Sequence, residues 1–132
     1  MKHIALIFIL SVLIAGCSGT PVYNVKNEFV PTGIDNGQLS VGAVEKAILK
    51  AAQRRGWSPR IVKPGLIEAS ISVRTHRATI EIYYSESQYS IIYKSSENLN
   101  YNDGDIHRNY NNWVIKLSRT IQQEFGVNSQ NY

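Results

Sequence analysis

The chain of 132 residues is poor in cysteine, with a single one, and it has no long hydrophobic run beyond its amino terminus. One cysteine excludes an internal disulfide, a zinc site built from several cysteines, and any cysteine nucleophile other than Cys17 itself. Since a helix needs roughly 20 apolar residues to cross a bilayer, the later sequence also excludes a membrane-spanning helix. What remains has the length of one domain.

Several catalytic and phosphate-binding motifs are also missing. The sequence has no Gly-x-Ser-x-Gly element of the kind a serine hydrolase uses and no glycine-rich phosphate loop. His76 and His107 have no carboxylate at the spacing of metal ligands. We therefore expect no catalytic residues, no metal and no cofactor. A small enzyme that uses His76 or His107 is the least favoured alternative.

The amino terminus has a short apolar run behind a positive charge. Lys2 supplies the charge, and only Ser11 interrupts the run from Ile4 to Ile14. The run is too short to cross about 30 Å of hydrocarbon, but it fits the apolar region of a secretory signal. It closes in Leu13-Ile14-Ala15-Gly16-Cys17, which resembles the bacterial lipobox. We predict a lipoprotein signal peptide over residues 1–16 and lipidation of Cys17; the alternative is an ordinary signal peptide with a chance cysteine.

Lipidation of Cys17 predicts where the protein resides. At least two acyl chains, such as palmitate, would hold the mature chain stably on a membrane. By resemblance to known sorting behaviour, an aspartate after the cysteine favours the inner membrane, whereas Ser18 permits transfer to the outer membrane. We expect the protein in the inner leaflet of the outer membrane, facing the periplasm, although the sequence does not decide between the two membranes.

Hydrophobic periodicity predicts one domain over residues 40–126 with the order helix, four strands, helix. The first helix begins at Ser40 and stops at Gly56, and the last runs from Ile106 to Phe125 with Asp103 or Asp105 as its cap. The alternating strands cover residues 58–62, 67–74, 78–84 and 88–94. We expect the α+β class: a two-layer sandwich, α-β-β-β-β-α, in which a four-stranded antiparallel meander carries both helices on one face. Residues 17–39 are interpreted as lipidated cysteine and tether, part of which can also form an edge strand, and residues 127–132 as a loose tail.

The formal net charge of +4 is unevenly distributed. From Lys46 to Arg77 there are eight basic residues and one acid, Glu68; the segment from Ala78 to Asp105 has five acids and one lysine. A basic stretch suits an anionic polymer or lipid of the envelope, while the alternative is a set of solvated faces. Nucleic acid is not an expected partner of an exported protein. The candidate binding residues here are Arg54, Arg55, Arg60, Lys63, Arg74, His76 and Arg77.

The segment Ile106-His107-Arg108-Asn109-Tyr110-Asn111-Asn112-Trp113 is the most unusual local sequence. Asparagine is a poor residue in a helix interior, because its side chain competes for backbone hydrogen bonds. The asparagines therefore either bond the preceding loop and fix the helix to the sheet, which we favour, or form a polar site. The candidate residues of such a site are His107, Arg108, Asn109, Asn111 and Asn112.

This segment also carries a resemblance. Together with the lipobox, Arg55-Gly56-Trp57, Pro64-Gly65 and Tyr89-Ser90-Ile91, it resembles a family of short, uncharacterised proteobacterial lipoproteins with a C-terminal Ile-His-x-Asn-Tyr-Asn-x-Trp helix. The resemblance covers most of the mature chain and implies location and fold, but no activity. We expect a membrane-anchored periplasmic lipoprotein that acts as a non-catalytic interaction module for another envelope protein. The alternative is a binder of an anionic envelope polymer or lipid through the region from Arg54 to Arg77.

Overall fold

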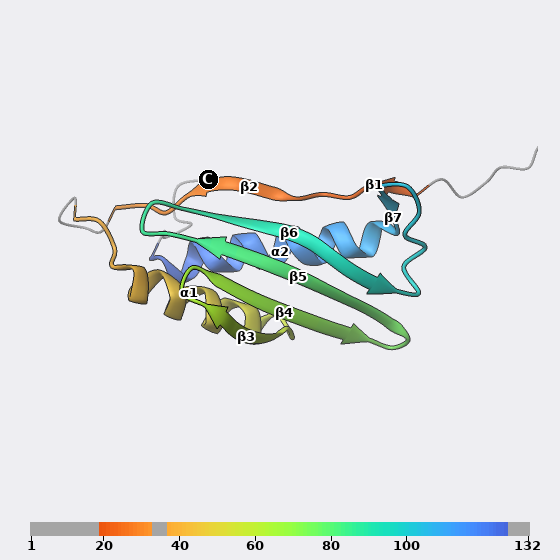
Figure 1. Cartoon of the computed structure of the whole chain (residues 1–132), viewed down its shortest axis with the longest axis horizontal. Helices are drawn as coiled ribbons and strands as arrows, with labels where there is room; N and C mark the ends of the chain where they lie inside the picture. The colour runs from red at the N-terminus through yellow and green to blue at the C-terminus, as the bar shows by residue number, and fades with distance from the viewer. Residues whose placement is uncertain (1–18, 33–36, 127–132) are drawn as a thin grey trace, which may run out of the picture.

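The computed structural model describes residues 19–32 and 37–126. The predicted signal peptide, Cys17, Ser18 and the predicted tail over residues 127–132 lie outside these residues. Figure 1 shows the elements in chain order, which are β1 (Thr20–Pro21), β2 (Val25–Phe29), α1 (Val41–Arg54), β3 (Ser58–Lys63), β4 (Leu66–Val73), β5 (His76–Tyr84), β6 (Gln88–Glu97), β7 (Asp105–Ile106) and α2 (Arg108–Glu124).

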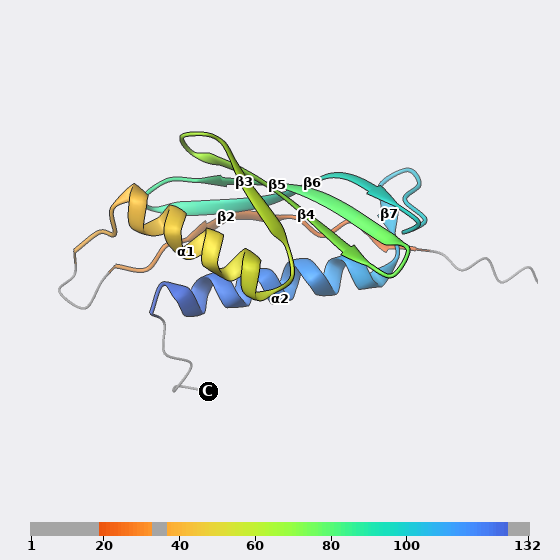
Figure 2. The same cartoon turned by 90° about the horizontal axis from the view of Figure 1, so that it is seen from below.

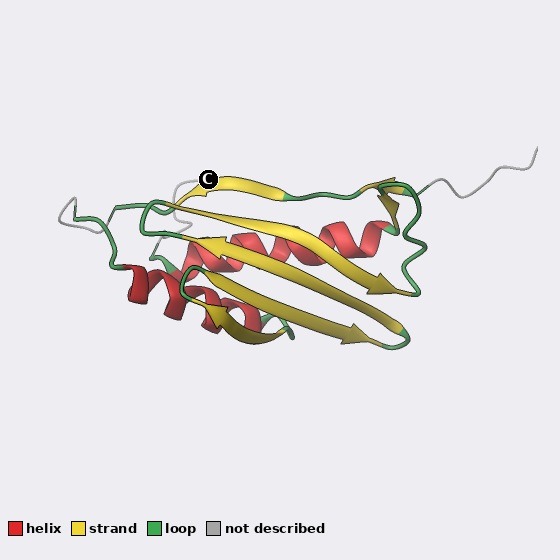
Figure 3. Ribbon diagram, viewed as in Figure 1, coloured by secondary structure: helices red, strands yellow, loops and turns green. Residues whose placement is uncertain are grey.

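Five strands form one antiparallel sheet in the order β2-β6-β5-β4-β3, and β1 pairs with β7 in a separate two-stranded sheet (Figure 3). Along β4, β5 and β6 apolar side chains alternate with polar ones, so one face of the sheet is apolar. Both helices lie against that face (Figure 2). The opposite, polar face of β3 to β6 carries neither of the two described helices and is called the open face below.

The predicted fold, a four-stranded meander with the order α-β-β-β-β-α, is wrong. The segment predicted as tether supplies a fifth strand, β2, which pairs with β6 through Val25 and Ile91 and again through Phe29 and Gln88. It also supplies β1, in which Thr20 pairs with Ile106. The periodicity of β2 is weak because a register shift follows Val25 and only that residue of the strand is buried. The edge-strand alternative for this segment is the one the structure has.

The ends of α1 match their sequence signals. Ser40 Oγ accepts a hydrogen bond from Ala43 N–H at 3.1 Å, as an N-cap does. At the other end Gly56 has a φ of +80° and Trp57 N–H donates to Ala52 C=O at 2.9 Å. This closing turn brings the Trp57 side chain under the sheet, where it is buried.

Helix α2 begins two residues later than predicted, at Arg108. Ile106 is taken up by β7, so the aspartates are not its cap. Instead His107 is the N-cap, and its Nδ1 accepts a hydrogen bond from Asn109 N–H at 3.1 Å. Tyr110 and Leu117 of α2 are fully buried and face the core.

The core lies between the apolar face of the sheet and the two helices. Ile48, Ile80 and Leu117 are among its fully buried side chains, each of which contributes about 1.5 to 3 kcal/mol by leaving water. The Tyr84 hydroxyl donates to Glu45 of α1. Burial and, to a smaller extent, this hydrogen bond raise the pKa of Tyr84 to about 12. The core and both sheets as described are formed by residues between 19 and 126. None of the helices described has the length and apolar character needed for a membrane crossing.

Candidate anion-binding groove

A groove lies between the end of β4 and helix α2, where β4 and β5 run beyond the carboxyl end of α1 (Figure 1). It consists of two adjoining hollows of about 370 and 310 Å³, which share Val73, Trp113 and Lys116. The lining of this groove is Arg54, Arg55, Gly56, Trp57, Ile71, Val73, Arg74, His76, Asn109, Asn112, Trp113 and Lys116.

One side of α2 forms a wall of the groove. Asn109, Asn112, Trp113 and Lys116 follow one another at helical spacing, so they share a face. The next turn continues this face with Thr120, which joins the two helices. Arg55 Nε donates to Thr120 Oγ1 at 2.6 Å, and the Thr120 hydroxyl donates to Lys116 C=O at 2.9 Å.

The hollow beside the carboxyl end of α1 contains both tryptophans of the chain, together with Arg54, Arg55 and Lys116. Trp57 is 3% exposed, and its indole Nε1 is buried without a hydrogen-bond partner among the described residues. Trp113 is half-buried on α2, and Val73 is exposed at the end of β4. The indole N–H of Trp57 is therefore an unused hydrogen-bond donor, and burying such a donor is unfavourable.

The polar part of the groove is cationic. None of the described residues that line it is an aspartate or a glutamate. Arg54 forms an ion pair with Glu124, which does not line the groove. The pKa of Glu124 is lowered by the hydrogen bond from Arg54 and, to a smaller extent, by the one from Lys50. Arg74 and Lys116, by contrast, form no ion pair with any described residue. The groove therefore offers uncompensated positive charge to an anion.

Hydrogen bonds fix the β4–β5 hairpin, which carries Arg74. His76 Nδ1 lies 2.6 Å from Asn98 C=O, and Asn98 Nδ2 donates to Thr75 C=O at 2.9 Å. A carbonyl only accepts, so Nδ1 of His76 carries the proton. The His76 ring stacks on His107, with 6.1 Å between the ring centroids. The described residues contain no cluster of three or more His, Cys, Asp or Glu able to hold a metal ion.

Asn111 lies on a different side of α2 and holds the amino-terminal segment. Its Oδ1 accepts from Tyr23 N–H at 2.9 Å, and its Nδ2 donates to Pro21 C=O at 2.9 Å and to Thr20 Oγ1 at 3.2 Å. Asn111 thus has the structural role expected for this segment, although its partner is the amino-terminal segment and not the preceding loop. Arg108 is exposed at the start of the helix.

The other predicted binding residues lie away from the groove. Arg60 Nη2 donates to Glu68 Oε1 at 3.1 Å, and Lys94 Nζ donates to Glu68 Oε2 at 2.6 Å. Both bonds lower the pKa of Glu68, and the bond from Lys94 has the larger effect. Lys63 is exposed at the far end of β3. The basic stretch of the sequence is therefore not one surface.

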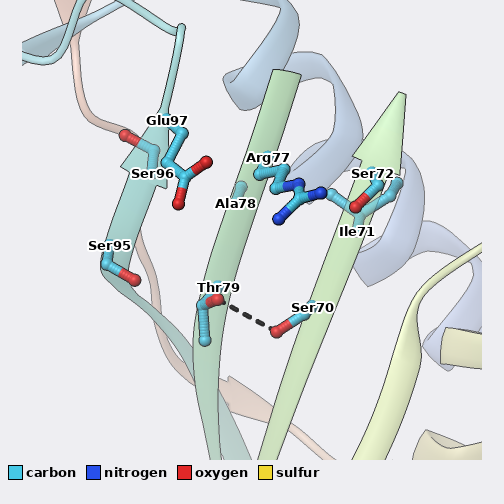
Figure 4. A pocket seen from close by; sticks show the side chains of 9 residues that line it. All are labelled: Ser70, Ile71, Ser72, Arg77, Ala78, Thr79, Ser95, Ser96 and Glu97. Atoms are coloured by element: carbon cyan, nitrogen blue, oxygen red, sulfur yellow. Dashed lines mark hydrogen bonds between the residues drawn. The ribbon is translucent and has the colours of Figure 1, made fainter. Parts of the chain in front are cut away.

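Arg77 lines a hollow of about 330 Å³ on the open face. Its cross-strand neighbours are Ser72 and Glu97. Figure 4 shows the Arg77 side chain extending toward β4, with the Glu97 carboxylate on β6 at its other side. The hydroxyls of Ser70 and Thr79 are joined at 2.9 Å on the same face. This hollow mixes acid, base and hydroxyl groups, so it has no preference for one sign of charge.

Half of the residues that line the groove were among the candidates predicted from the sequence, and the other half were not. Trp57, Trp113 and Lys116 were not among the candidate binding residues. The helical spacing of Asn109, Asn112, Trp113 and Lys116 was a signal that could have found this wall. The course of β4 brings Arg74 to this wall of α2. No local sequence pattern reveals that course.

Comparison with known proteins adds no function. No family model matches the chain, no curated protein matches it, and no solved structure matches it. The resemblance to short proteobacterial lipoproteins therefore stays a prediction, and the function has to be inferred from the geometry of the residues.

Proposed function

We propose that the protein is a lipid-anchored lipoprotein of the bacterial envelope and acts as a non-catalytic binding module at the membrane surface. The lipobox ending at Cys17 and the short apolar run before it support the anchor. Ser18 supports the inner leaflet of the outer membrane, facing the periplasm. The resemblance to short lipoproteins of proteobacteria supports the same location.

The observation that carries this proposal is that the chain is already packed on the domain at Gly19, two positions after Cys17 in the sequence. A Cβ placed on Gly19 would lie 3.1 Å from both Ile106 N and Ile106 O, so this residue packs directly on β7. Val22 N–H donates to Gly104 C=O at 2.8 Å, and Asn111 holds the next residues. Two peptide units span at most about 7 Å, so a lipid on Cys17 would hold the domain against the membrane and not on a long tether.

The attachment also defines which end of the domain would face the lipid. The strands β1 and β7, the amino-terminal end of α2 and the β4–β5 hairpin all lie at one end of the molecule, where the chain enters from its amino terminus (Figures 1 and 2). With Cys17 lipidated, this end rests on the membrane. The two edge strands and the open face then stand away from the bilayer, accessible from the periplasm.

Exposed apolar side chains on the edge strands support a protein partner. Ile61 and Val62 are about half exposed on β3, and Phe29 is 80% exposed at the end of β2. Edge strands also present unpaired backbone N–H and C=O groups, which another chain can pair with. These features favour an interaction module over a protein that acts alone.

Analysis of the amino-terminal peptide tests the anchor. We expect mass spectrometry of the membrane-extracted protein to find a mature chain that begins at Cys17 and carries acyl chains, with radiolabelled palmitate incorporated into the wild type. The Cys17→Ser variant should incorporate no label and should not be processed, whereas the Ser18→Ala variant should be labelled normally. A wild-type chain that begins at Cys17 without lipid would contradict the anchor.

Site-specific crosslinking in intact cells tests the binding role. A photoreactive residue in place of Val62 should give one crosslinked envelope protein, while the same residue in place of Tyr83, which is about half exposed on the open face, serves as the matched control. The crosslink should disappear when Ile61 is also changed to Lys, which leaves the strand but adds a charge. Absence of a specific crosslink, together with turnover of an envelope substrate by the purified protein, would overturn a non-catalytic role.

A further inference from the structure

The sheet leaves the end of β4 without a neighbour on one side, and the groove lies beside this end. The last pair between β3 and β4 is that of Ser58 and Ser70, because the residues before Ser58 form the turn after α1. β4 and β5 stay paired three residues further, as far as Val73 and His76. The last three residues of β4 therefore have a free edge on the side that β3 has left (Figure 1).

This free edge presents the backbone of Ser72. Tyr84 N–H of β5 donates at 3.0 Å to the C=O of Gly65, which directly precedes β4. In an antiparallel ladder alternate residues bond to the same neighbour, so Ile71 and Val73 also bond to β5. The N–H and C=O of Ser72 point to the other side, and no backbone group of a described turn or loop bonds to them. They are therefore able to pair with the backbone of an added strand.

The side chains of an added strand would alternate between the groove and the open face. Ile71 and Val73 line the groove, whereas the side chain of Ser72 lies in the hollow of the open face. A strand paired with β4 follows the same alternation, because neighbouring residues point to opposite faces of a sheet. A segment bound along this edge thus places two side chains, two residues apart, in the groove.

The charge of the groove selects acidic side chains for these two positions. Positive groups occur in both hollows, with Arg55 and Lys116 beside the indoles and Arg74 and Lys116 beside the hairpin. No described aspartate or glutamate lines either hollow. Glutamate suits the groove better than aspartate, because its methylene groups can pack against the half-buried Trp113 while its carboxylate reaches the cations.

We propose that an acidic segment of a protein partner binds in the groove as an added antiparallel strand beside the end of β4. Its backbone pairs with Ser72. Two of its glutamates, two residues apart, enter the groove, where one meets Arg74 and Lys116 and the other meets Arg55. This inference rests on the proposed binding role and names the part of the partner that the domain holds. The free backbone favours a peptide over a glycan or a lipid, which has no row of N–H and C=O groups to pair with a strand.

A synthetic peptide tests the site on the full chain. The protein is purified from the expressing cells in a nonionic detergent, so the measurement does not depend on lipid at Cys17. The probe is acetyl-Val-Glu-Val-Glu-Val-amide, in which the glutamates stand two residues apart. Because both tryptophans of the chain line the groove, their fluorescence reports its occupancy. We expect saturable binding that weakens with salt, and absence of saturable binding would overturn the proposal.

Two charge-matched variants locate the binding. Arg74→Gln with Lys116→Gln removes two positive charges from the groove, and Lys46→Gln with Lys63→Gln removes two exposed charges elsewhere. We expect the control to bind the peptide as the wild type does, and the affinity of the groove variant to be roughly tenfold lower. Melting curves verify that both variants are folded. Equal affinity in the two variants would overturn the proposal.

Methylation of single nitrogens of the probe tests the strand pairing. The N–H of the central valine points to Ser72, whereas that of the following glutamate points away from β4. N-methylation of the valine should weaken binding roughly fivefold, and N-methylation of that glutamate should change it by less than about twofold. Equal effects of the two methylations would show that the peptide is not bound as a strand.

A change in the protein tests the same pairing from the other side. Ser72→Pro removes the N–H that faces the free edge, which an edge strand tolerates, and it should weaken binding of the peptide as the methylated valine does. Ser72→Ala keeps the backbone N–H and should bind as the wild type does. The methylated peptides require no change of the protein, so they decide the outcome if Ser72→Pro does not fold.

An acidic glycan separates a peptide site from a general site for polyanions. Trigalacturonate carries three carboxylates but no peptide groups, so it should bind at least about fivefold more weakly than the peptide. Its binding should also be the same in Ser72→Pro and Ser72→Ala. If trigalacturonate binds as tightly as the peptide, the groove is a site for polyanions and the proposal fails.

Crosslinking in intact cells separates failure of this site from failure of the binding role. A photoreactive residue in place of Asn112, which lines the groove, should capture a protein whose crosslinked peptide, identified by mass spectrometry, contains an acidic segment. If Val62 captures a partner and Asn112 does not, the binding role stands and the groove proposal fails. If neither position captures a protein, the binding role itself fails.

Discussion

The open face of the sheet and the groove hold similar numbers of basic side chains, but they differ in whether acidic side chains lie beside them. On the open face Glu68 lies between Arg60 and Lys94, with both bonds at hydrogen-bond distance, and Arg77 has Glu97 as a cross-strand neighbour. In the groove, Arg74 and Lys116 have no acid beside them among the described residues. The first surface is neutralised within the fold, whereas the second carries positive charge that no described acidic residue pairs with.

The difference arises from strand pairing. β4 and β6 lie on either side of β5, so the acid Glu68 of the basic stretch reaches the base Lys94 of the acidic stretch across the intervening strand. Arg74 lies in a turn and Lys116 on a helix, where no strand ladder supplies a partner. A run of like charges in the sequence is thus no evidence for a charged surface until the pairing of each residue is known.

The largest expected effect comes from making the groove resemble the open face. Lys116→Glu removes a positive charge and places an acid beside Arg74, a change of two charges. Since each ion pair at a surface contributes up to about 1 kcal/mol, affinity for the acidic peptide should fall roughly 30-fold. The tryptophan fluorescence titration measures it. A Lys46→Glu variant, with the same charge change on α1, should bind as the wild type does, and an equal loss there would erase the distinction between groove and surface.

The second largest effect is a difference in the free energy of unfolding between variants of two adjacent asparagines of α2. Asn111→Ala removes three hydrogen bonds to residues 20–23 and should lower the free energy of unfolding by about 1.5 kcal/mol. Asn112 lines the groove and is exposed, so Asn112→Ala should change stability by less than about 0.5 kcal/mol. Urea denaturation compares them. Equal costs would show that the groove side of α2 is needed for folding and is not reserved for a ligand.

The elements of the domain were largely predictable, while its sites were not. Ser40, Gly56 and the alternation of β4 are local signals, and the structure confirms the elements they predicted. β2 was missed as a regular element because its one buried residue and its register shift leave no period to read. His107 as a cap was missed because Ile106 pairs with Thr20, a contact between residues far apart in the sequence. The groove depends on such contacts throughout.

A smaller effect is expected where the groove meets a neutralised arginine. Glu124 of α2 accepts a hydrogen bond from Arg54, and its Oε2 lies 3.2 Å from Lys50 Nζ. These contacts join α2 to α1. Glu124→Gln keeps the shape but removes the charge, so unfolding should cost about 0.5 kcal/mol less, as is typical of exposed ion pairs. Arg54 then becomes uncompensated, and the acidic peptide should bind about fivefold more tightly. Calorimetry and the fluorescence titration measure the two effects, and unchanged binding would exclude Arg54 from the peptide site.

The smallest effect concerns the open face alone, and it depends on pH. Lys94 and then Arg60 lower the pKa of Glu68 below its usual 4.5, so the folded state favours the charged carboxylate. The resulting stabilisation is complete above that usual pKa and is lost as the pH falls through the lower folded value. The wild type should therefore melt higher than Glu68→Gln at pH 7, and the difference should vanish under strongly acidic conditions. For Lys116→Gln, which breaks no ion pair, the melting difference from the wild type should stay constant over the same pH range. A difference that varies with pH for Lys116→Gln would reveal an acidic partner in the groove and remove the contrast between the two surfaces.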